Sequence, residues 1–154
     1  MASFSLLLVD DEKEFVETTA QRLRKRGYTV FCAYSGPEAL EILAENDDVD
    51  VVILDIKMPE PDGIETLHIL KSRHPLVEVI MLTGHAAVPS AIESLKKRAF
   101  DYLTKPCDLH NLLAKAEKAA ARKKEREVKI LDVRAIPYIS DRERKRLIDE
   151  ILQS

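Results

Sequence analysis

Residues 51–63 read VVILDIKMPEPDG, and this stretch decides how the chain folds. Its four leading apolar residues are typical of a short strand that is covered on both faces, as in a parallel sheet. The strand reaches Asp55, after which two prolines and a glycine turn the chain. A carboxylate in this place either caps the turn or is a reactive group held at the rim of a sheet.

Length and composition bound the class of protein. The 154 residues fit one domain with a short appendage. Acidic residues number 27 against 24 basic ones, so the net charge is −3, and we expect no direct binding to nucleic acid.

The cysteines and the apolar runs indicate the compartment. Cys32 and Cys107 lie far apart and match no metal-binding spacing, which favours reduced intracellular thiols. The amino-terminal residues lack the basic segment of a signal peptide, and no apolar run approaches the roughly 20 residues of a membrane span. We therefore expect a cytoplasmic protein that does not enter a membrane.

Strand and helix patterns alternate along the chain. Apolar runs at 6–9, 29–34, 51–54, 77–82 and 100–103 predict five short strands. Ser35 and Glu38 have capping-box spacing and predict a helix near 36–45. Two apolar stripes at helical spacing predict further helices; their members are Val88, Ala91, Ile92 and Leu95, and Leu109, Leu112, Leu113 and Ala116. This alternation predicts an α/β fold, a doubly wound parallel sheet with helices on both faces.

Five polar residues follow the predicted strands at their carboxyl ends. They are Asp10 and Asp11 after the first strand, Asp55 after the third, Thr83 after the fourth and Lys105 after the fifth. Each alone is better explained as a turn or helix cap. As a set they converge on the edge where an open parallel sheet forms its binding crevice.

The chemistry of these residues is complementary. Converging carboxylates repel each other and raise one another's pKa unless a cation joins them, and an oxygen-only cluster with open positions suits Mg²⁺. The Lys105 ammonium and the Thr83 hydroxyl could hold a phosphoryl group beside that metal. A strand-end carboxylate in such a place can attack phosphorus, so we predict that Asp55 is the acceptor of an aspartyl phosphate.

The segments LLLVDDE, VVILDIKMPEPDG, VIMLTGHA and AFDYLTKP resemble the signature segments of receiver domains of two-component response regulators. The resemblance runs from residue 6 to about residue 121 and implies a flavodoxin-like sheet with strand order 2-1-3-4-5. It also implies a regulatory phosphoacceptor rather than an enzyme, which assists its own phosphorylation and dephosphorylation. The donor to Asp55 would be a sensor histidine kinase or a histidine phosphotransfer protein.

The resemblance further implies the ligands of Mg²⁺. Asp11 and Asp55 would bind the ion together with the main-chain carbonyl of Lys57, and Asp10 would assist. Thr83 and Lys105 would bind the phosphoryl group.

The resemblance assigns the switch as well. Tyr102 would be the aromatic residue whose rotamer follows Thr83, and phosphorylation would alter the face between the fourth and fifth helices. The Lys105–Pro106 bond would be cis. Arg98 stands where the family often has a left-handed glycine, so it must either accept strain or end the fourth helix differently. His85 is expected at the rim of the crevice.

Three other interpretations compete with this one. A phosphatase of the haloacid-dehalogenase type needs a second carboxylate two residues after its nucleophile, where this chain has Lys57. A degenerate receiver that only binds partners would lack phosphorylation residues, yet all are present. The chain could also be the amino-terminal regulatory part of a longer transcriptional regulator.

The tail suggests a boundary. We predict a receiver domain over 1–126 and an extension over 127–154 with a short amphipathic helix and no recognised output domain. The segment VKILDVRAIPYI is apolar and contains Pro137, so we expect it to be extended. Ser140 and Glu143 have capping-box spacing and predict a helix after it.

That last helix carries an apolar stripe formed by Leu147, Ile148, Ile151 and Leu152. A helix of this length needs a partner surface to bury its stripe. The surface could belong to the chain's own receiver, to a second copy in a homodimer, or to another protein. We hypothesise that the tail mediates association and that phosphorylation of Asp55 changes it.

Overall fold

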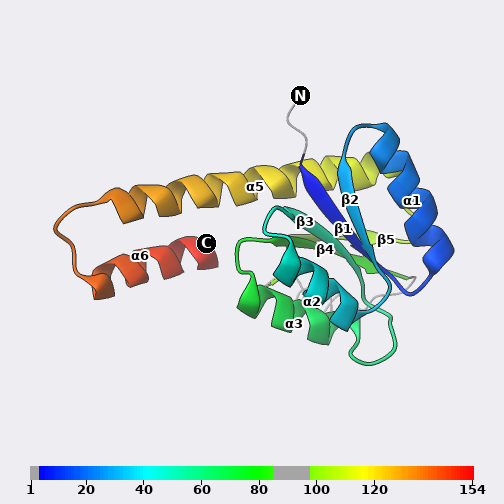
Figure 1. Cartoon of the computed structure of the whole chain (residues 1–154), viewed down its shortest axis with the longest axis horizontal. Helices are drawn as coiled ribbons and strands as arrows, with labels where there is room; N and C mark the ends of the chain where they lie inside the picture. Colours follow the sequence, from blue (N-terminus) through cyan, green and yellow to red (C-terminus); the bar gives the residue numbers. More distant parts are fainter. Residues whose placement is uncertain (1–3, 85–97) are drawn as a thin grey trace.

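The computed structural model describes residues 4–84 and 98–154 and contains a five-stranded parallel sheet (Figure 1). Its strands are β1 (Ser5–Val9), β2 (Thr29–Ala33), β3 (Val51–Asp55), β4 (Glu78–Thr83) and β5 (Asp101–Thr104). Their order is β2-β1-β3-β4-β5, as the resemblance implied. Every strand begins and ends within one residue of its predicted bounds, because buried parallel strands are nearly continuous in apolar residues.

Helices cover both faces of the sheet. Helices α1 (Lys13–Lys25) and α5 (Leu109–Ala135) pack on one face, and α2 (Gly36–Glu45) and α3 (Gly63–Arg73) pack on the other (Figure 1). Successive strand residues alternate between these two cores, so Leu6 and Leu8 face α1 and α5 while Leu7 and Val9 face α2 and α3. The predicted doubly wound α/β fold is confirmed.

Strand pairing brings the candidate residues to one edge. Asp55 lies opposite Leu82 at the end of β4, and Thr83 lies opposite Thr104 at the end of β5. The carboxyl ends of β1, β3, β4 and β5 therefore meet at the same rim, as expected for parallel strands.

The predicted helix starts are also confirmed. The Ser35 hydroxyl accepts a hydrogen bond from the Glu38 amide at 3.3 Å and begins α2. The Ser140 hydroxyl accepts one from the Glu143 amide at 3.1 Å and begins α6 (Asp141–Gln153). The stripe predicted at 88–95 and the predicted position of His85 lie outside the described residues.

The prediction of an extended segment after residue 127 is wrong, because α5 continues without a break to Ala135. The helix ends two residues before Pro137, which cannot continue it. Helix α6 then folds back along α5 and covers its outer half (Figure 1). The buried positions of α5 are spaced alternately four and three residues apart along its whole length: Leu112, Ala116, Ala119, Lys123, Arg126, Ile130 and Val133. One side of α5 is thus buried along its whole length, by the sheet near its amino end and by α6 near its carboxyl end.

The tail stripe packs within its own chain. All four of its residues are half-buried on the helix that lies along α5, so the intramolecular alternative is the one observed. The boundary proposed after residue 126 falls inside α5. Association with a second chain, and its dependence on phosphorylation, stays a prediction.

Tyr138 is the sole non-glycine residue with a positive φ in the described parts of the chain, so Arg98 does not adopt the left-handed conformation. None of the described helices is both long enough and apolar enough to cross a lipid bilayer.

The glycine that ends the opening stretch is required by a close approach of two backbones. A Cβ atom at Gly63 would lie 2.1 Å from the carbonyl oxygen of Asp55 and 2.7 Å from Cα of Ile56. The Gly63 amide instead donates to the Ile56 carbonyl at 3.0 Å. The turn after Asp55 is therefore folded against the end of its own strand, which fixes the backbone that carries the carboxylate.

We predict that Gly63→Ala destabilises the protein by about 1–3 kcal/mol, because the added methyl group overlaps main-chain atoms that cannot move aside. Urea denaturation followed by circular dichroism measures the change. Gly84→Ala is the matched control, since a Cβ atom there meets nothing within 4 Å. Equal midpoints for the two variants would contradict the prediction.

Candidate functional site

Three carboxylates meet at the carboxyl edge of the sheet. Asp10 follows β1 and Asp55 ends β3, and their side chains are buried, whereas Asp11 is exposed. One oxygen from each of the three lies within 4.8 Å of the others. The fold thus brings together the acidic residues that the sequence singled out, and they could hold a metal ion.

Lys105 joins this cluster from the loop after β5. Its Nζ lies 2.5 Å from Oδ2 of Asp10 and 3.7 Å from Oδ2 of Asp55. Burial lowers the pKa of Lys105, but the hydrogen bond and the charge of Asp10 outweigh it, so the pKa is raised overall. The ammonium therefore stays charged and offsets part of the repulsion between the carboxylates.

Asp55 is the carboxyl group whose ionisation is opposed most clearly. Burial and the negative charge of Asp10 raise its pKa to about 6, although Lys105 and the Lys57 amide, which donates at 3.3 Å, act in the other direction. These effects apply to the protein without a metal ion. A cation placed among the carboxylates would favour the ionised form of Asp55, which is the form that a nucleophile needs.

Thr83 lies beside Lys105 at the end of β4. Its side chain is buried, and its carbonyl accepts a hydrogen bond from the Lys105 amide at 2.7 Å. Tyr102 is half-buried in β5, packs against the core under α2 and α3, and lies 5.5 Å from the ammonium of Lys115. The Lys105–Pro106 bond is cis, as the resemblance implied, and so is Glu60–Pro61.

Glu12 takes part in the site and was missed from the sequence. Its carboxylate lies 3.2 Å from Lys105 Nζ, and its amide donates to Oδ1 of Asp10 at 3.0 Å. Its side chain is largely exposed, so it adds charge at the rim. The run of three acidic residues in LVDDE was the available signal, but only the tertiary position of Lys105 shows that the third one contributes.

The donor set suits a hard divalent cation. All three side chains offer oxygen, two are held by the ends of neighbouring strands, and the exposed Asp11 leaves the cluster open to solvent. Such a cation binds a few carboxylates and keeps its other positions for water or phosphate oxygens. The cluster therefore fits a magnesium-type site better than a closed structural metal site.

Comparison with known proteins decides the family. The family model described as "Response regulator receiver domain" matches residues 6–117. The chain belongs to this family. It is therefore a regulatory phosphoacceptor domain of two-component signalling rather than a catalytic enzyme.

Individual relatives agree with this assignment. The receiver is 41% identical over 119 residues to the transcriptional regulatory protein ZraR of Escherichia coli K12, which covers 77% of this chain and 27% of that protein. A response regulator receiver domain protein from Clostridium thermocellum superposes with a TM-score of 0.73 at 38% identity, over 79% of this chain and 97% of that one. A CheY-like receiver from Methanospirillum hungatei gives 0.71 at 30% identity, over 80% and 98%. The chain thus spans about a quarter of the length of ZraR.

We predict that Asp55→Asn stabilises the metal-free receiver at pH 7 by about 1–3 kcal/mol, because the folded state opposes ionisation of the buried carboxylate. The pKa is raised from 3.8 to about 6, so wild-type stability falls as the pH rises through this window. The advantage of the variant should be absent below the lower value and complete above the upper one.

Urea midpoints in the presence of a chelator, taken from pH 3.5 to pH 8, measure this difference. Asp101→Asn is the control, since Asp101 is partly exposed and paired with Lys115 at 2.8 Å. A gain from Asp55→Asn that does not vary with pH would contradict the assigned cause.

Proposed function

We propose that the chain is a phosphorylation switch in which Asp55 accepts a phosphoryl group from the phosphohistidine of a sensor histidine kinase or a histidine phosphotransfer protein. An Asp55 carboxylate oxygen forms the new P–O bond, the P–N bond to the donor breaks, and its electron pair returns to the imidazole nitrogen. The observation that carries the proposal is the position of Asp55, buried at a strand end between two carboxylates and a lysine.

Mg²⁺ is the cofactor that the donor set favours. Asp10, Asp11 and Asp55 would hold it together with the main-chain carbonyl of Lys57, and the ion would neutralise charge shared by the carboxylates and the incoming phosphoryl group. The protein's own part is to hold Asp55 in place through the Gly63 turn and to present its oxygen to the rim.

Lys105 and Thr83 bind the phosphoryl group in this proposal. The ammonium already reaches both Asp10 and Asp55, so a small movement would bring it to a phosphoryl oxygen. Thr83 ends the adjacent strand β4, and its hydroxyl supplies a hydrogen-bond donor. Tyr102, on the strand next to Thr83, would follow it and change the face between the fourth and fifth helices.

Two observations support proposals about the cellular compartment of the chain and about its place in a longer protein. Cys32 and Cys107 are both unpaired, which fits a reducing, cytoplasmic compartment. Coverage of about a quarter of ZraR favours a second candidate, in which this receiver is the amino-terminal regulatory part of a longer transcriptional regulator. The phosphatase alternative gains no support, because the residue two positions after Asp55 is Lys57.

We predict that incubation with Mg²⁺ and acetyl phosphate adds the mass of one phosphoryl group, because the Asp55 carboxylate ends a strand beside Asp10, Asp11 and the Lys105 ammonium. Intact-mass spectrometry measures the uptake. A chelator should suppress it, and Asp55→Asn should abolish it. Asp62→Asn is the matched control, since asparagine can still cap α3 as Asp62 does. Uptake that persists in Asp55→Asn would place the acceptor elsewhere.

We predict that Lys105→Ala slows phosphoryl uptake by about ten- to a hundredfold, because a charge-assisted contact to the phosphoryl group is lost. Lys57→Ala removes an exposed lysine side chain at the same rim and keeps the main-chain groups, so it should react like the wild type. Uptake rates come from timed intact-mass spectra, with circular dichroism to verify the fold. Similar rates in both variants would remove Lys105 from the proposed role.

A further inference from the structure

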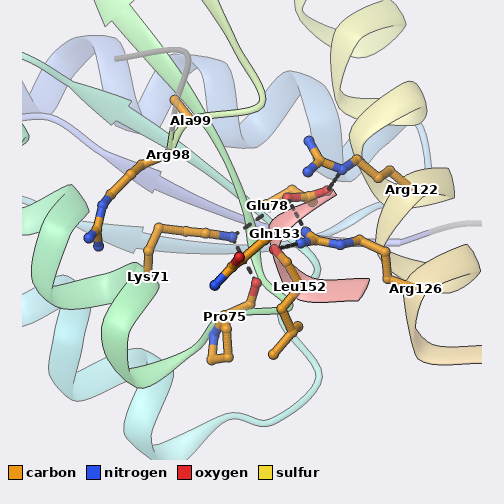
Figure 2. Close-up of a pocket in the computed structure, with 9 residues that line it drawn as sticks. All are labelled: Lys71, Pro75, Glu78, Arg98, Ala99, Arg122, Arg126, Leu152 and Gln153. Atoms are coloured by element: carbon orange, nitrogen blue, oxygen red, sulfur yellow. Dashed lines mark hydrogen bonds and ion pairs between the residues drawn. The ribbon is translucent and has the colours of Figure 1, made fainter. Parts of the chain in front are cut away.

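A second group of charges lies at the opposite edge of the sheet. Glu78 begins β4, and its buried carboxylate is surrounded by three cations (Figure 2). Lys71 Nζ of α3 lies 3.7 Å from it, Arg122 Nε of α5 lies 3.1 Å away and Arg126 Nη1 of α5 lies 3.5 Å away. Among the described residues, one carboxylate thus faces three cations, so positive charge is in excess around Glu78.

The lysine of this group is already engaged elsewhere. Its ammonium donates to the carbonyls of Pro75 and Val77 at 2.8 and 2.9 Å. Burial lowers the pKa of Lys71 to about 8; Glu78 opposes this effect, and the charges of Arg126 and Arg122 add to it. The two arginines are therefore the groups that still require a negative partner.

The carboxyl end of α6 supplies that partner. Arg126 donates to the carbonyl of Ile151 at 3.2 Å and to that of Leu152, which Figure 2 shows. Arg122 donates to the main-chain oxygen of Ser154, the residue that follows α6, at 2.9 Å. The last carbonyls of a helix are unpaired within the helix and carry partial negative charge. The last turn of α6 contains no basic residue of its own, so the arginines of α5 cap it.

The capping is reciprocal. Arg144, on α6, donates to the carbonyls of Val133 at 2.8 Å and Arg134 at 3.0 Å in the last turn of α5, and to that of the cap residue Ile136 at 3.2 Å. Each of the two antiparallel helices thus has its carboxyl end satisfied by arginines of the other. Contacts of this kind have direction, whereas apolar burial does not.

The apolar contact between the helices is incomplete. A cavity of about 270 Å³ lies between the α3–β4 turn and the two helices, and Ile130, Ile148 and Leu152 line it. The stripe residues of α6 are only half-buried. Arginine contacts therefore carry more of the specificity of this packing than close apolar fit does.

We propose that Arg122 and Arg126 form a binding site for the carboxyl end of an amphipathic helix, and that α6 occupies this site as an intramolecular ligand. Glu78 holds the two guanidinium groups in place from the sheet, and Arg144 fixes the other end of the bound helix. The site recognises an apolar stripe that ends in a turn without basic residues. A partner protein that displaces α6 must present a helix of the same kind.

Hydrogen exchange of the full chain, measured by mass spectrometry, tests whether Arg122 and Arg126 hold α6 in its bound position. Arg122→Gln/Arg126→Gln should raise the exchange rate of residues 141–154 by at least about tenfold, because the capping contacts of α6 are lost. Arg144→Gln should do the same from the other end. Arg142→Gln, on the exposed face of α6, is the matched control and should exchange like the wild type. Peptides from β1 and β3 report whether each variant is folded.

A peptide added in trans tests whether the groove itself is the receptor. The probe is an amidated, fluorescein-labelled peptide with the sequence of residues 139–154, followed by fluorescence anisotropy. It should bind the Arg144→Gln variant, in which α6 is loosened and both receptor arginines remain, at least about tenfold more tightly than the wild type, where α6 competes. It should not bind Arg122→Gln/Arg126→Gln.

Two results would overturn the proposal. One is equal peptide affinity for Arg144→Gln and Arg122→Gln/Arg126→Gln, which would make the apolar stripe sufficient. The other is unchanged exchange of residues 141–154 in Arg144→Gln, a variant that leaves the Glu78 group intact and so decides the matter even if the double variant unfolds.

Discussion

The geometry of the carboxyl edge depends on Lys105, whose ammonium offsets the repulsion among the three carboxylates that converge there. The lysine follows the edge strand β5, yet its ammonium reaches Asp10, on the far side of β3 and β4, at 2.5 Å. It can do so because the Lys105 amide is fixed to the Thr83 carbonyl at 2.7 Å, as an extension of the parallel pairing of β4 with β5. The strand order therefore determines the electrostatics of the rim. A sheet with β5 in another place would leave the same acidic residues without their cation.

The two edges of the sheet carry opposite imbalances of charge. Negative charge is in excess at the carboxyl edge, where the carboxylates of Asp10, Asp11 and Asp55 converge. Positive charge is in excess at the amino edge, where the cations gather around Glu78. Each imbalance is partly buried and each invites a ligand of the opposite sign, a cation in the first case and helix carbonyls in the second. Strand β4 joins the two, since Glu78 begins it and Thr83 ends it.

The sequence predicted the sheet and the carboxylate cluster well because both are local in origin. Each strand is a buried apolar run, and the acidic residues follow directly after strand ends, so the parallel sheet predicted from the alternation places them at one edge. The helical conformation of residues 128–135 was not predicted, since the β-branched residues there favour an extended segment in sequence, whereas in the fold Ile130 and Val133 are buried positions of α5. The Glu78 group was also missed. Glu78 and Arg126 are 48 residues apart, and the arginines of α5 look in sequence like an ordinary solvated charge run.

Reciprocal capping makes the lengths of two helices depend on each other. Helix α6 contacts α5 at two places, at Arg122 and Arg126 and again at the carbonyls near its carboxyl end. The distance between these two places along α5 therefore fixes the length of α6. One residue inserted into α5 between these positions would rotate its outer part by about 100°, and Arg144 would then face away from its acceptors. An insertion of seven residues would nearly restore the direction, with a residual rotation of about 20°, but would move the acceptors outward by two turns. Only a matching insertion in α6 would recover the contacts, so the hairpin is expected to change length in paired steps of whole heptads.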